Sequence, residues 1–164
     1  MEIEQIIINP IGIIHTPFLD INDMPIQPIA AEGVKGSIEL FPKFVEGLTD
    51  LAGFSHITLI YQFHKITGYQ LRVKPFMDNV EHGIFATKSP KRPNAIGLST
   101  VKLLNIEHNI IHFEMADMLD GTPLIDIKPF FSKFDNRMDT LSGWLDKQGE
   151  ISVDKLRSDE RFRN

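Results

Sequence analysis

The chain has 164 residues, of which 42% are hydrophobic and 24% charged, a length and balance typical of one globular domain with a substantial core. Its net charge of −5 argues against binding nucleic acid over the whole surface, although it leaves room for a local basic patch. The absence of cysteine excludes disulfides, thiolate nucleophiles and cysteine-based zinc sites. No apolar run has the length of a membrane-spanning helix, and no basic segment leads an apolar one at the N-terminus, so we expect a cytoplasmic protein without membrane attachment.

Short runs of β-type residues recur along the chain, separated by turn-forming residues. They predict strands at 6–14, 36–41, 55–64, 101–106, 110–115 and 121–130. The clearest is 55–64, because its apolar side chains from Ile57 to Phe63 alternate onto one face. Between the fourth and fifth strands, residues 107–109 predict a hairpin turn in which Asn109 tolerates a left-handed conformation.

Helical patterns are few. Residues 20–31 predict a loop, and residues 42–51 predict one short helix with Pro42 at its first position and Gly53 beyond its end. With seven or so strands and no alternation of strand and helix, the chain is expected to be mainly β, an antiparallel sheet closed into a barrel or a sandwich.

From Thr140 onward the sequence becomes polar, with Trp144 as its main apolar anchor. A short helix followed by a charged tail fits this composition. We therefore divide the chain into a β-barrel domain at 1–138 and a short helical C-terminal extension at 139–164.

The stretch from His82 to Ser99 is the most informative part of the sequence. It contains Lys88, Lys91 and Arg92 without an intervening acid, on a segment that Pro90 and Pro93 make stiff and extended. Stiffness of this kind suits a loop that holds a ligand. A basic, proline-rich surface connector is the alternative, and the stretch taken alone does not decide between them.

A second informative stretch runs from Asp120 to Pro129. Its Asp-Gly turn presents backbone N–H groups beside the Thr122 hydroxyl, and Asp126 and Lys128 project from one face of the strand that follows. Burial of a carboxylate and an ammonium among apolar neighbours costs free energy, unless the two charges pair or take part in a functional site. A solvated ion pair on an outer face is the other interpretation.

The remaining polar candidates are weaker. His64 and Lys65 end the clearest strand, where polar side chains often belong to sites, although a single histidine there is more often structural. His108 and His112 flank a predicted hairpin and would not converge, so we expect no metal site. No phosphate-binding or dinucleotide-binding glycine motif and no nucleophile context is present. These features favour a site that binds a small molecule and transfers a group directly.

Two long motifs resemble the signature of the TsaA-like (TrmO-type) family of tRNA methyltransferases. They read HGIFATKSPKRPNAIGLS at 82–99 and DGTPLIDIKP at 120–129. Residues 11–18, 51–56 and 63–64 follow the same family in the same order, so the resemblance covers roughly the first 130 residues. Two long motifs in order are far more specific than one short pattern.

The resemblance implies a small antiparallel β-barrel that binds S-adenosylmethionine without a Rossmann domain and acts as a homodimer. The family's reaction is methylation of N6 in threonylcarbamoyl-adenosine beside the tRNA anticodon. Carried over by position, the methyl-donor pocket would use Pro25, Gln27, His64, Lys65, Lys88, Leu98, Gly121, Thr122, Pro123 and Leu124. Near the reacting groups the resemblance places Arg92, Asn94, Asp126 and Lys128.

On this interpretation N6 is weakly nucleophilic, and a carboxylate nearby would help to remove its proton. Asp126 is the first candidate for that base and Asp120 the second, with Asn94 completing the catalytic set. Lys91, Arg92 and Lys128 would hold the substrate's carboxylate or phosphates of the anticodon loop. A homodimer would present two such basic patches to one RNA despite the acidic total.

Three positions depart from the family's pattern. Lys88 and Ile26 stand where arginine is usual, and Ala95 replaces a usual proline, so the donor site loses a bidentate contact and a cation. Two alternatives therefore remain: a β-barrel that binds an adenosyl ligand or RNA without catalysis, and a methyltransferase that acts on a different acceptor.

Overall fold

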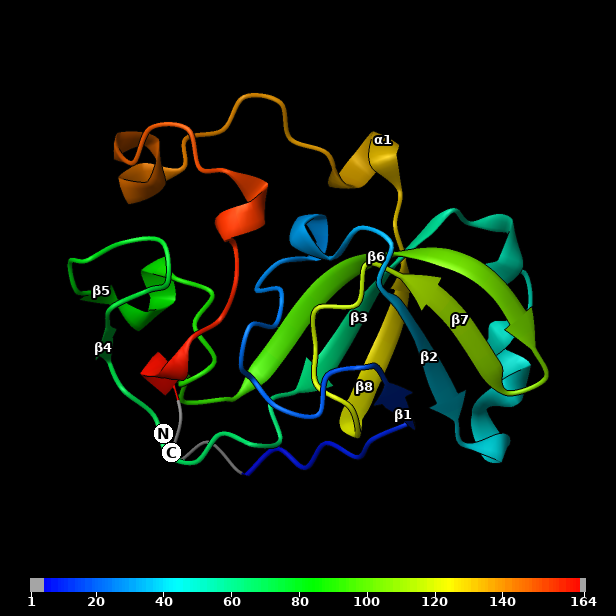
Figure 1. Cartoon of the computed structure of the whole chain (residues 1–164). Helices are drawn as coiled ribbons and strands as arrows, with labels where there is room; N and C mark the ends of the chain where they lie inside the picture. Colours follow the sequence, from blue (N-terminus) through cyan, green and yellow to red (C-terminus); the bar gives the residue numbers. More distant parts are fainter. Residues whose placement is uncertain (1–4, 163–164) are drawn as a thin grey trace.

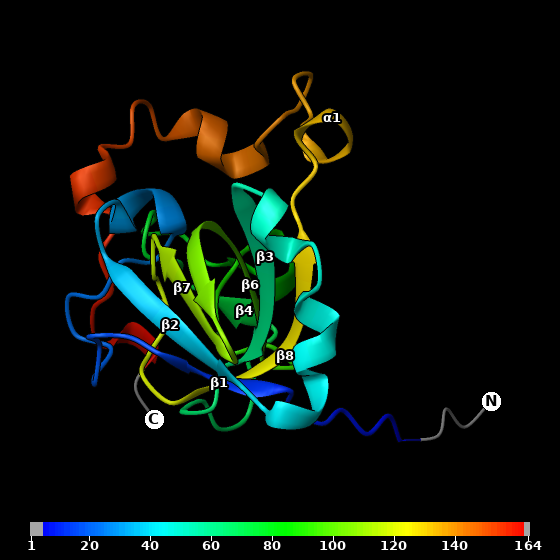
Figure 2. The same ribbon diagram turned by 90° about the vertical axis from the view of Figure 1, so that its right-hand side faces the viewer.

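A computed structural model describes residues 5–162 and confirms a mainly β chain built on a closed antiparallel barrel (Figures 1 and 2). Around the barrel the strand order is β1–β2–β7–β6–β3–β8, with β8 pairing back onto β1. The barrel strands are β1 (Gly12–His15), β2 (Lys35–Leu40), β3 (His56–Gln62), β6 (Ile96–Glu107), β7 (Ile110–Glu114) and β8 (Thr122–Pro129). A separate two-stranded sheet consists of β4 (Arg72–Val73) and β5 (His82–Gly83).

The barrel interior is filled by alternate residues of each strand. On β3 the buried residues are Ile57, Leu59 and Tyr61, which confirms the predicted face. The other strands contribute Ile14, Ile38, Leu40, Val101, Leu103, Ile111, Phe113 and Leu124. Removal of these apolar side chains from water is the main favourable term in the stability of the barrel.

The pairing of β3 with β8 contains a bulge. Tyr61 lies opposite Leu124 and Ile60 lies opposite Asp126, so Ile125 has no counterpart on β3. Because Leu124 is fully buried, the bulge resets the alternation of β8, and Asp126 comes to share the outer face with Ile60.

The first predicted strand, at 6–14, is wrong in length, because β1 spans only Gly12–His15. Ile6, Ile7 and Ile8 are more than half exposed outside the barrel. Pro10 interrupts the segment, since proline lacks the N–H that a ladder needs. At Gly12 a Cβ atom would lie 2.6 Å from the Glu39 carbonyl oxygen, so glycine allows β1 and β2 to approach closely.

The predicted helix at 42–51 is replaced by two 3-10 turns, Pro42–Leu48 and Leu51–Gly53. Pro42 does occupy the first position of its turn, as predicted. Asp50 separates the two turns with a left-handed backbone (φ 65°), which a continuous α-helix does not allow.

The hairpin between β6 and β7 forms where it was predicted, with a different residue in the left-handed conformation. His108, not Asn109, has the positive φ of 56°. The Asn109 side chain instead donates from Nδ2 to the Leu40 carbonyl oxygen over 3.0 Å and ties the turn to β2.

The C-terminal segment returns to the loops at one end of the barrel. From α1 (Ser132–Asp135) it crosses above the barrel in both views and descends beside the β4–β5 sheet (Figures 1 and 2). In place of one predicted helix it forms 3-10 turns at Gly143–Lys147, Val153–Lys155 and Glu160–Phe162. The division at residue 138 stays a prediction. No helix within residues 5–162 is both long and apolar enough to cross a bilayer.

Candidate functional site

A cavity of about 350 Å³ opens between one end of the barrel and the segments that surround it. Its walls come from β3 and β6, the loop before the 3-10 turn Pro28–Ala31, the segment 63–92, the connection between β7 and β8, and the C-terminal segment. Apolar side chains dominate the lining, among them Ile21, Met24, Phe63, Phe76, Met77, Ile96, Met118 and Trp144. This size and lining are typical of a site for a small molecule or cofactor.

Seven of the sequence-predicted residues line the cavity together. They are Gln27, His64, Lys65, Lys88, Leu98 and Thr122, all predicted for the methyl donor, and Arg92, predicted for the substrate. They come from five separate parts of the chain, so only the fold brings them together.

The other predicted residues lie outside this lining. Pro25 is buried and forms a β-bridge with Arg157, and Leu124 is in the barrel core. The remaining residues outside the lining are Lys91, Asn94, Asp120, Gly121, Pro123, Asp126 and Lys128. Their predicted roles stay predictions.

Asp126 and Lys128 form an ion pair on the outer face of β8. Lys128 Nζ lies 2.8 Å from Asp126 Oδ2, with the two side chains 63% and 44% exposed. Asp126 Oδ1 also accepts a hydrogen bond from the Ile127 backbone N–H. Of the two interpretations of the sequence, the solvated ion pair on an outer face therefore describes this contact. Exposed pairs of this kind contribute little to stability.

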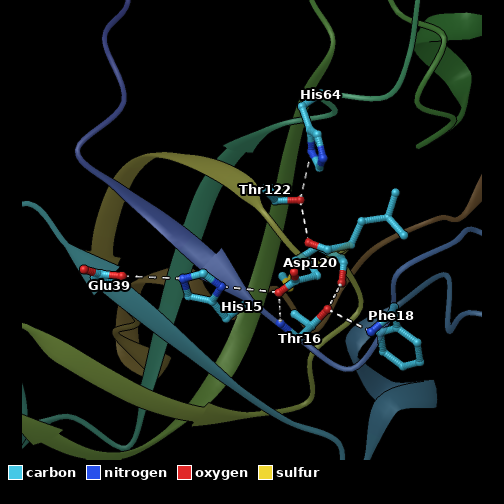
Figure 3. A network of polar contacts seen from close by, with 9 residues as sticks. His15, Thr16, Phe18, Glu39, His64, Asp120 and Thr122 are labelled. Carbon is cyan, nitrogen blue, oxygen red and sulfur yellow. Dashed lines mark hydrogen bonds and ion pairs between the residues drawn. The ribbon is translucent and has the colours of Figure 1, made fainter.

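Asp120 holds the entry to β8 against the end of β1 (Figure 3). Its Oδ1 accepts from the Thr16 backbone N–H at 3.1 Å and lies 3.3 Å from His15 Nδ1. Gly121 adopts φ 73° in the predicted Asp-Gly turn, and its N–H donates to the Ile14 carbonyl oxygen. The carboxylate of Asp120 thus fixes a turn beside the cavity.

Thr122 and His64 connect this turn to the cavity wall (Figure 3). Thr122 Oγ1 donates to the Leu119 carbonyl oxygen at 2.7 Å and lies 3.3 Å from His64 Nδ1. Partial burial and the neighbouring Lys65 lower the pKa of His64, against the opposing effect of Asp120. The imidazole is therefore neutral at pH 7 and presents one donor and one acceptor nitrogen.

Arg92 braces the loop on which it lies. Its Nη1 donates to the carbonyl oxygens of Ile84 (3.1 Å) and Thr87 (2.7 Å), and its guanidinium lies 5.9 Å from the centre of the Phe85 ring. The proline-rich stretch is thus ordered by its own arginine and contributes to the cavity wall.

A buried chain of polar groups at the cavity was missed by the sequence analysis. Tyr61 on β3, Ser99 on β6 and Asp117 before β8 are each less than 10% exposed and all contribute to the lining. Ser99 Oγ donates to Asp117 Oδ1 at 2.7 Å, and because that uses its only proton, the Tyr61 hydroxyl donates to Ser99 at 3.0 Å.

Burial sets the proton affinity of this chain. It raises the pKa of the Asp117 carboxyl to about 7, against the opposing effects of the Ser99 hydrogen bond and the charge of Lys88. Burial and the nearby Asp117 also raise the pKa of the Tyr61 phenol. Tyr61 therefore stays neutral, while Asp117 titrates near physiological pH.

One sequence signal could have identified Asp117. It is a lone acid inside the apolar run Met115–Leu119, directly before the second motif. Met115 adopts a left-handed backbone (φ 76°), an unusual conformation for methionine, at the point where the chain turns toward the cavity. The buried Oγ of Ser89, also on the lining, has no hydrogen-bond partner among the described residues.

The C-terminal segment closes one side of the cavity with Trp144, Ser158 and Phe162. Trp144 Nε1 donates to the Ala86 carbonyl oxygen at 2.8 Å, and its ring stacks on His82 at 4.5 Å, so it anchors the segment as predicted. Phe162 is buried and packs edge-on against Phe76. Among residues 5–162 no group of three or more histidine and acidic side chains is arranged to hold a metal ion.

The profile of the tRNA-methyltransferase O N-terminal domain matches residues 13–136, most of the chain. The chain belongs to this family. The match confirms the resemblance drawn from the two motifs and includes the barrel, the proline-rich loop and Asp117.

Relatives of this TrmO-type chain carry related names. A probable S-adenosyl-L-methionine-binding protein of Pyrococcus abyssi is 49% identical over 153 residues, which cover 93% of this chain and 83% of that protein. The human tRNA (adenine(37)-N6)-methyltransferase is 30% identical over 153 residues, 89% of this chain and 35% of the human protein. A crystal structure of TrmO from Pseudomonas aeruginosa superposes with a TM-score of 0.74 at 34% identity, covering 88% of this chain and 63% of that one. This TrmO-type chain thus spans about a third of the human protein and less than two thirds of the solved chain.

The family profile ends before the C-terminal wall of the cavity. Trp144, Ser158 and Phe162 lie beyond residue 136, so this TrmO-type chain completes its cavity with a segment outside the shared domain.

Proposed function

We propose that this chain binds S-adenosylmethionine in the cavity and methylates N6 of an adenosine in tRNA. The observation that carries the proposal is the convergence of Gln27, His64, Lys65, Lys88, Leu98 and Thr122 on one cavity. The family resemblance assigns each of these residues to the methyl donor by its sequence position alone. The names of the relatives from Pyrococcus abyssi and human support the cofactor and the activity respectively.

The lining fits such a donor. Apolar walls that include Phe63, Met118 and Trp144 suit the adenine and the aliphatic parts of the molecule. Lys65 and Lys88 supply positive charge for its carboxylate, and the unpartnered Ser89 hydroxyl offers a hydrogen bond.

Bound S-adenosylmethionine supplies an electrophilic methyl group on a sulfonium centre. The protein's own contribution is positional, because transfer to a nitrogen depends on alignment of donor and acceptor more than on covalent assistance. The loop braced by Arg92 and the segment anchored by Trp144 hold the two sides of the cavity and exclude water.

The finer substrate we propose is threonylcarbamoyl-adenosine beside the anticodon. Arg92 at the cavity and Lys91 next to it place positive charge where a threonyl carboxylate or backbone phosphates would lie. N6 of that nucleoside needs a proton acceptor, for which Asp126 and Asp120 remain the sequence-based candidates, with Asn94 as the third member of the predicted catalytic set. None of these three residues lines the cavity, so the adenosine that accepts the methyl group would meet them at the outer side of the cavity.

A homodimer and a cytoplasmic location are part of the same proposal. Leu71, Phe85 and Leu98 are each at least 60% exposed on the segments around the cavity. A second copy of the chain would cover apolar surface of this kind and would double the basic patch presented to RNA.

The test is calorimetric titration of S-adenosylmethionine and S-adenosylhomocysteine, followed by transfer of a labelled methyl group to tRNA with and without the threonylcarbamoyl modification. Micromolar binding of both ligands and labelling of modified tRNA alone are the expected results. Binding without transfer would favour a non-catalytic adenosyl-binding protein. Transfer only to a small metabolite, without salt-sensitive tRNA binding, would favour the other acceptor class.

A further inference from the structure

The charges around the cavity are unbalanced. Lys65, Lys88 and Arg92 all contribute to its lining, whereas Asp117 is the only carboxylate among the described residues there. A ligand with a positive charge at its centre therefore enters a site rich in cations. Among the described residues of the lining, Asp117 is the one group whose negative charge can offset that of the cations.

We propose that Asp117 recognises the positive charge of the donor's sulfonium and so makes the cavity bind S-adenosylmethionine more tightly than the thioether product, whose sulfur is neutral. The inference rests on the proposed function, because it requires the donor to occupy this cavity. It adds a residue that separates substrate from product by charge and thereby favours release of the product after methyl transfer.

The geometry keeps Asp117 in place for this role. Its Oδ1 accepts from Ser99 on β6, and Ser99 accepts in turn from Tyr61 on β3, so two barrel strands orient the carboxylate. On its own segment, the N–H groups of Met115 and Ala116 both donate to the Val34 carbonyl oxygen, which fixes the left-handed turn before it. A carboxylate held this firmly loses little entropy when a ligand arrives.

The surroundings also make the carboxylate responsive to charge. Burial in a largely apolar wall strengthens its interaction with any nearby cation, because water does not screen it. The facing titratable groups are Tyr61 from β3, which stays neutral, and Lys88 from the proline-rich loop, whose charge acts on the Asp117 carboxyl. His64, Lys65 and Arg92 complete the titratable lining.

A coupling between proton and ligand follows. At pH below about 7 a large share of Asp117 is protonated in the ligand-free protein, and a sulfonium favours the ionised form. Binding of the charged donor then releases a proton, whereas binding of the product does not. The preference for donor over product should therefore grow as pH rises through 7 and become constant above it.

The experiment is calorimetric titration of S-adenosylmethionine and S-adenosylhomocysteine into the unchanged protein, Asp117→Asn and Ser99→Ala, between about pH 6 and pH 8. Asp117→Asn keeps the shape and can still accept from Ser99, but carries no charge. We expect it to weaken donor binding about tenfold or more at pH 8 and product binding less than about twofold. At each pH, the ratio of donor affinity to product affinity in the unchanged protein is divided by the same ratio in Asp117→Asn. This removes the pH dependence that comes from ionisable groups of the ligands.

Ser99→Ala tests the same group without altering its charge. Loss of the Ser99 hydrogen bond raises the pKa of Asp117 further, so the rise in donor preference should move to higher pH. Asp50→Asn is the matched control, because Asp50 is exposed and outside the lining, and it should leave both affinities unchanged. Circular dichroism melting curves establish that each variant is folded.

The outcomes separate this inference from the function on which it rests. An equal loss of affinity for both ligands in Asp117→Asn would place the carboxylate against a group that donor and product share. It would overturn this inference and leave the proposed function standing. An unchanged ratio would do the same. If neither ligand binds the unchanged protein, the proposed function fails and the inference fails with it.

Discussion

Two aspartates, Asp117 before β8 and Asp126 within it, have opposite surroundings. Asp126 on the outside has the Lys128 ammonium at 2.8 Å and water around both side chains. Asp117 on the inside is buried, accepts from the Ser99 hydroxyl and forms no ion pair with another described residue. The comparison shows that the sequence position of an aspartate does not indicate whether its carboxylate is buried or solvated, because the tertiary structure decides it.

The largest expected effect concerns the stability of the inner face. The pKa of Asp117 rises from 3.8 to about 7 on folding, so between these values the folded state binds the proton more tightly than the unfolded state. Stability should therefore fall as pH rises from about 4 to about 7, by about 4 kcal/mol from this group, and then level off. Asp117→Asn should remove this decline and be the more stable protein at pH 8.

Urea unfolding of both proteins from pH 5 to pH 8 measures this difference. The other titrating groups are common to the two proteins, so the difference between their curves isolates Asp117. Parallel curves across the whole range would show that Asp117 is solvated and that the two faces do not differ.

A smaller effect on stability is expected when the hydrogen bonds that join Tyr61, Ser99 and Asp117 are disturbed without a change of charge. A Cβ atom at Gly97 would lie 2.3 Å from the Tyr61 ring, so Gly97→Ala should push Tyr61 away from Ser99. We expect a loss of about 1–3 kcal/mol from overpacking, together with weaker donor binding.

Gly53→Ala is the matched control for that variant. Nothing lies within 4 Å of a Cβ atom at Gly53, and its φ is not left-handed, so stability and binding should stay close to those of the unchanged protein. Unfolding in urea and calorimetry report the two quantities. Equal behaviour of the two alanine variants would argue that the Tyr61 ring moves aside at no cost.

The smallest effect on stability is expected at the outer face. Asp126→Asn and Lys128→Gln break the same exposed ion pair, and each should change the free energy of unfolding by less than about 1 kcal/mol. Their turnover distinguishes the predicted roles. If Asp126 is the base, Asp126→Asn lowers kcat far more than Lys128→Gln while donor affinity is unchanged. Equal turnover in the two variants would remove Asp126 from the catalytic set.

The barrel was predictable where local patterns and tertiary pairing agree. The alternation from Ile57 to Tyr61 predicted a strand with one buried face, and the structure confirms it in β3. The first strand was predicted too long because isoleucine-rich composition favours strands, whereas Pro10 and the close approach at Gly12 determine where pairing begins. Pro10 is visible in the sequence, whereas the close approach at Gly12 appears only when β1 and β2 pair.

The site was predictable to the extent that motifs carry it. Lys88, Leu98 and Thr122, which the family resemblance assigns to the methyl donor, line one cavity, and their role in donor binding stays a prediction. Tyr61 lies in the predicted strand 55–64 and Ser99 in the motif at 82–99, yet nothing in the sequence connected them with Asp117. The three residues are separated in the chain and meet only across the barrel. The C-terminal wall with Trp144 was likewise expected only as an extension with an anchor.

The sequence by itself determined the strand composition, the absence of thiol chemistry and the family, because these depend on residue types, their period and the order of motifs. The tertiary structure decided which carboxylate is buried and which is solvated. One bulge at Ile125 places Asp126 on the outside, and one left-handed turn at Met115 precedes Asp117 on the inside. The proton affinity of a carboxylate depends on the water and charges around it, and those surroundings exist only once the barrel has closed.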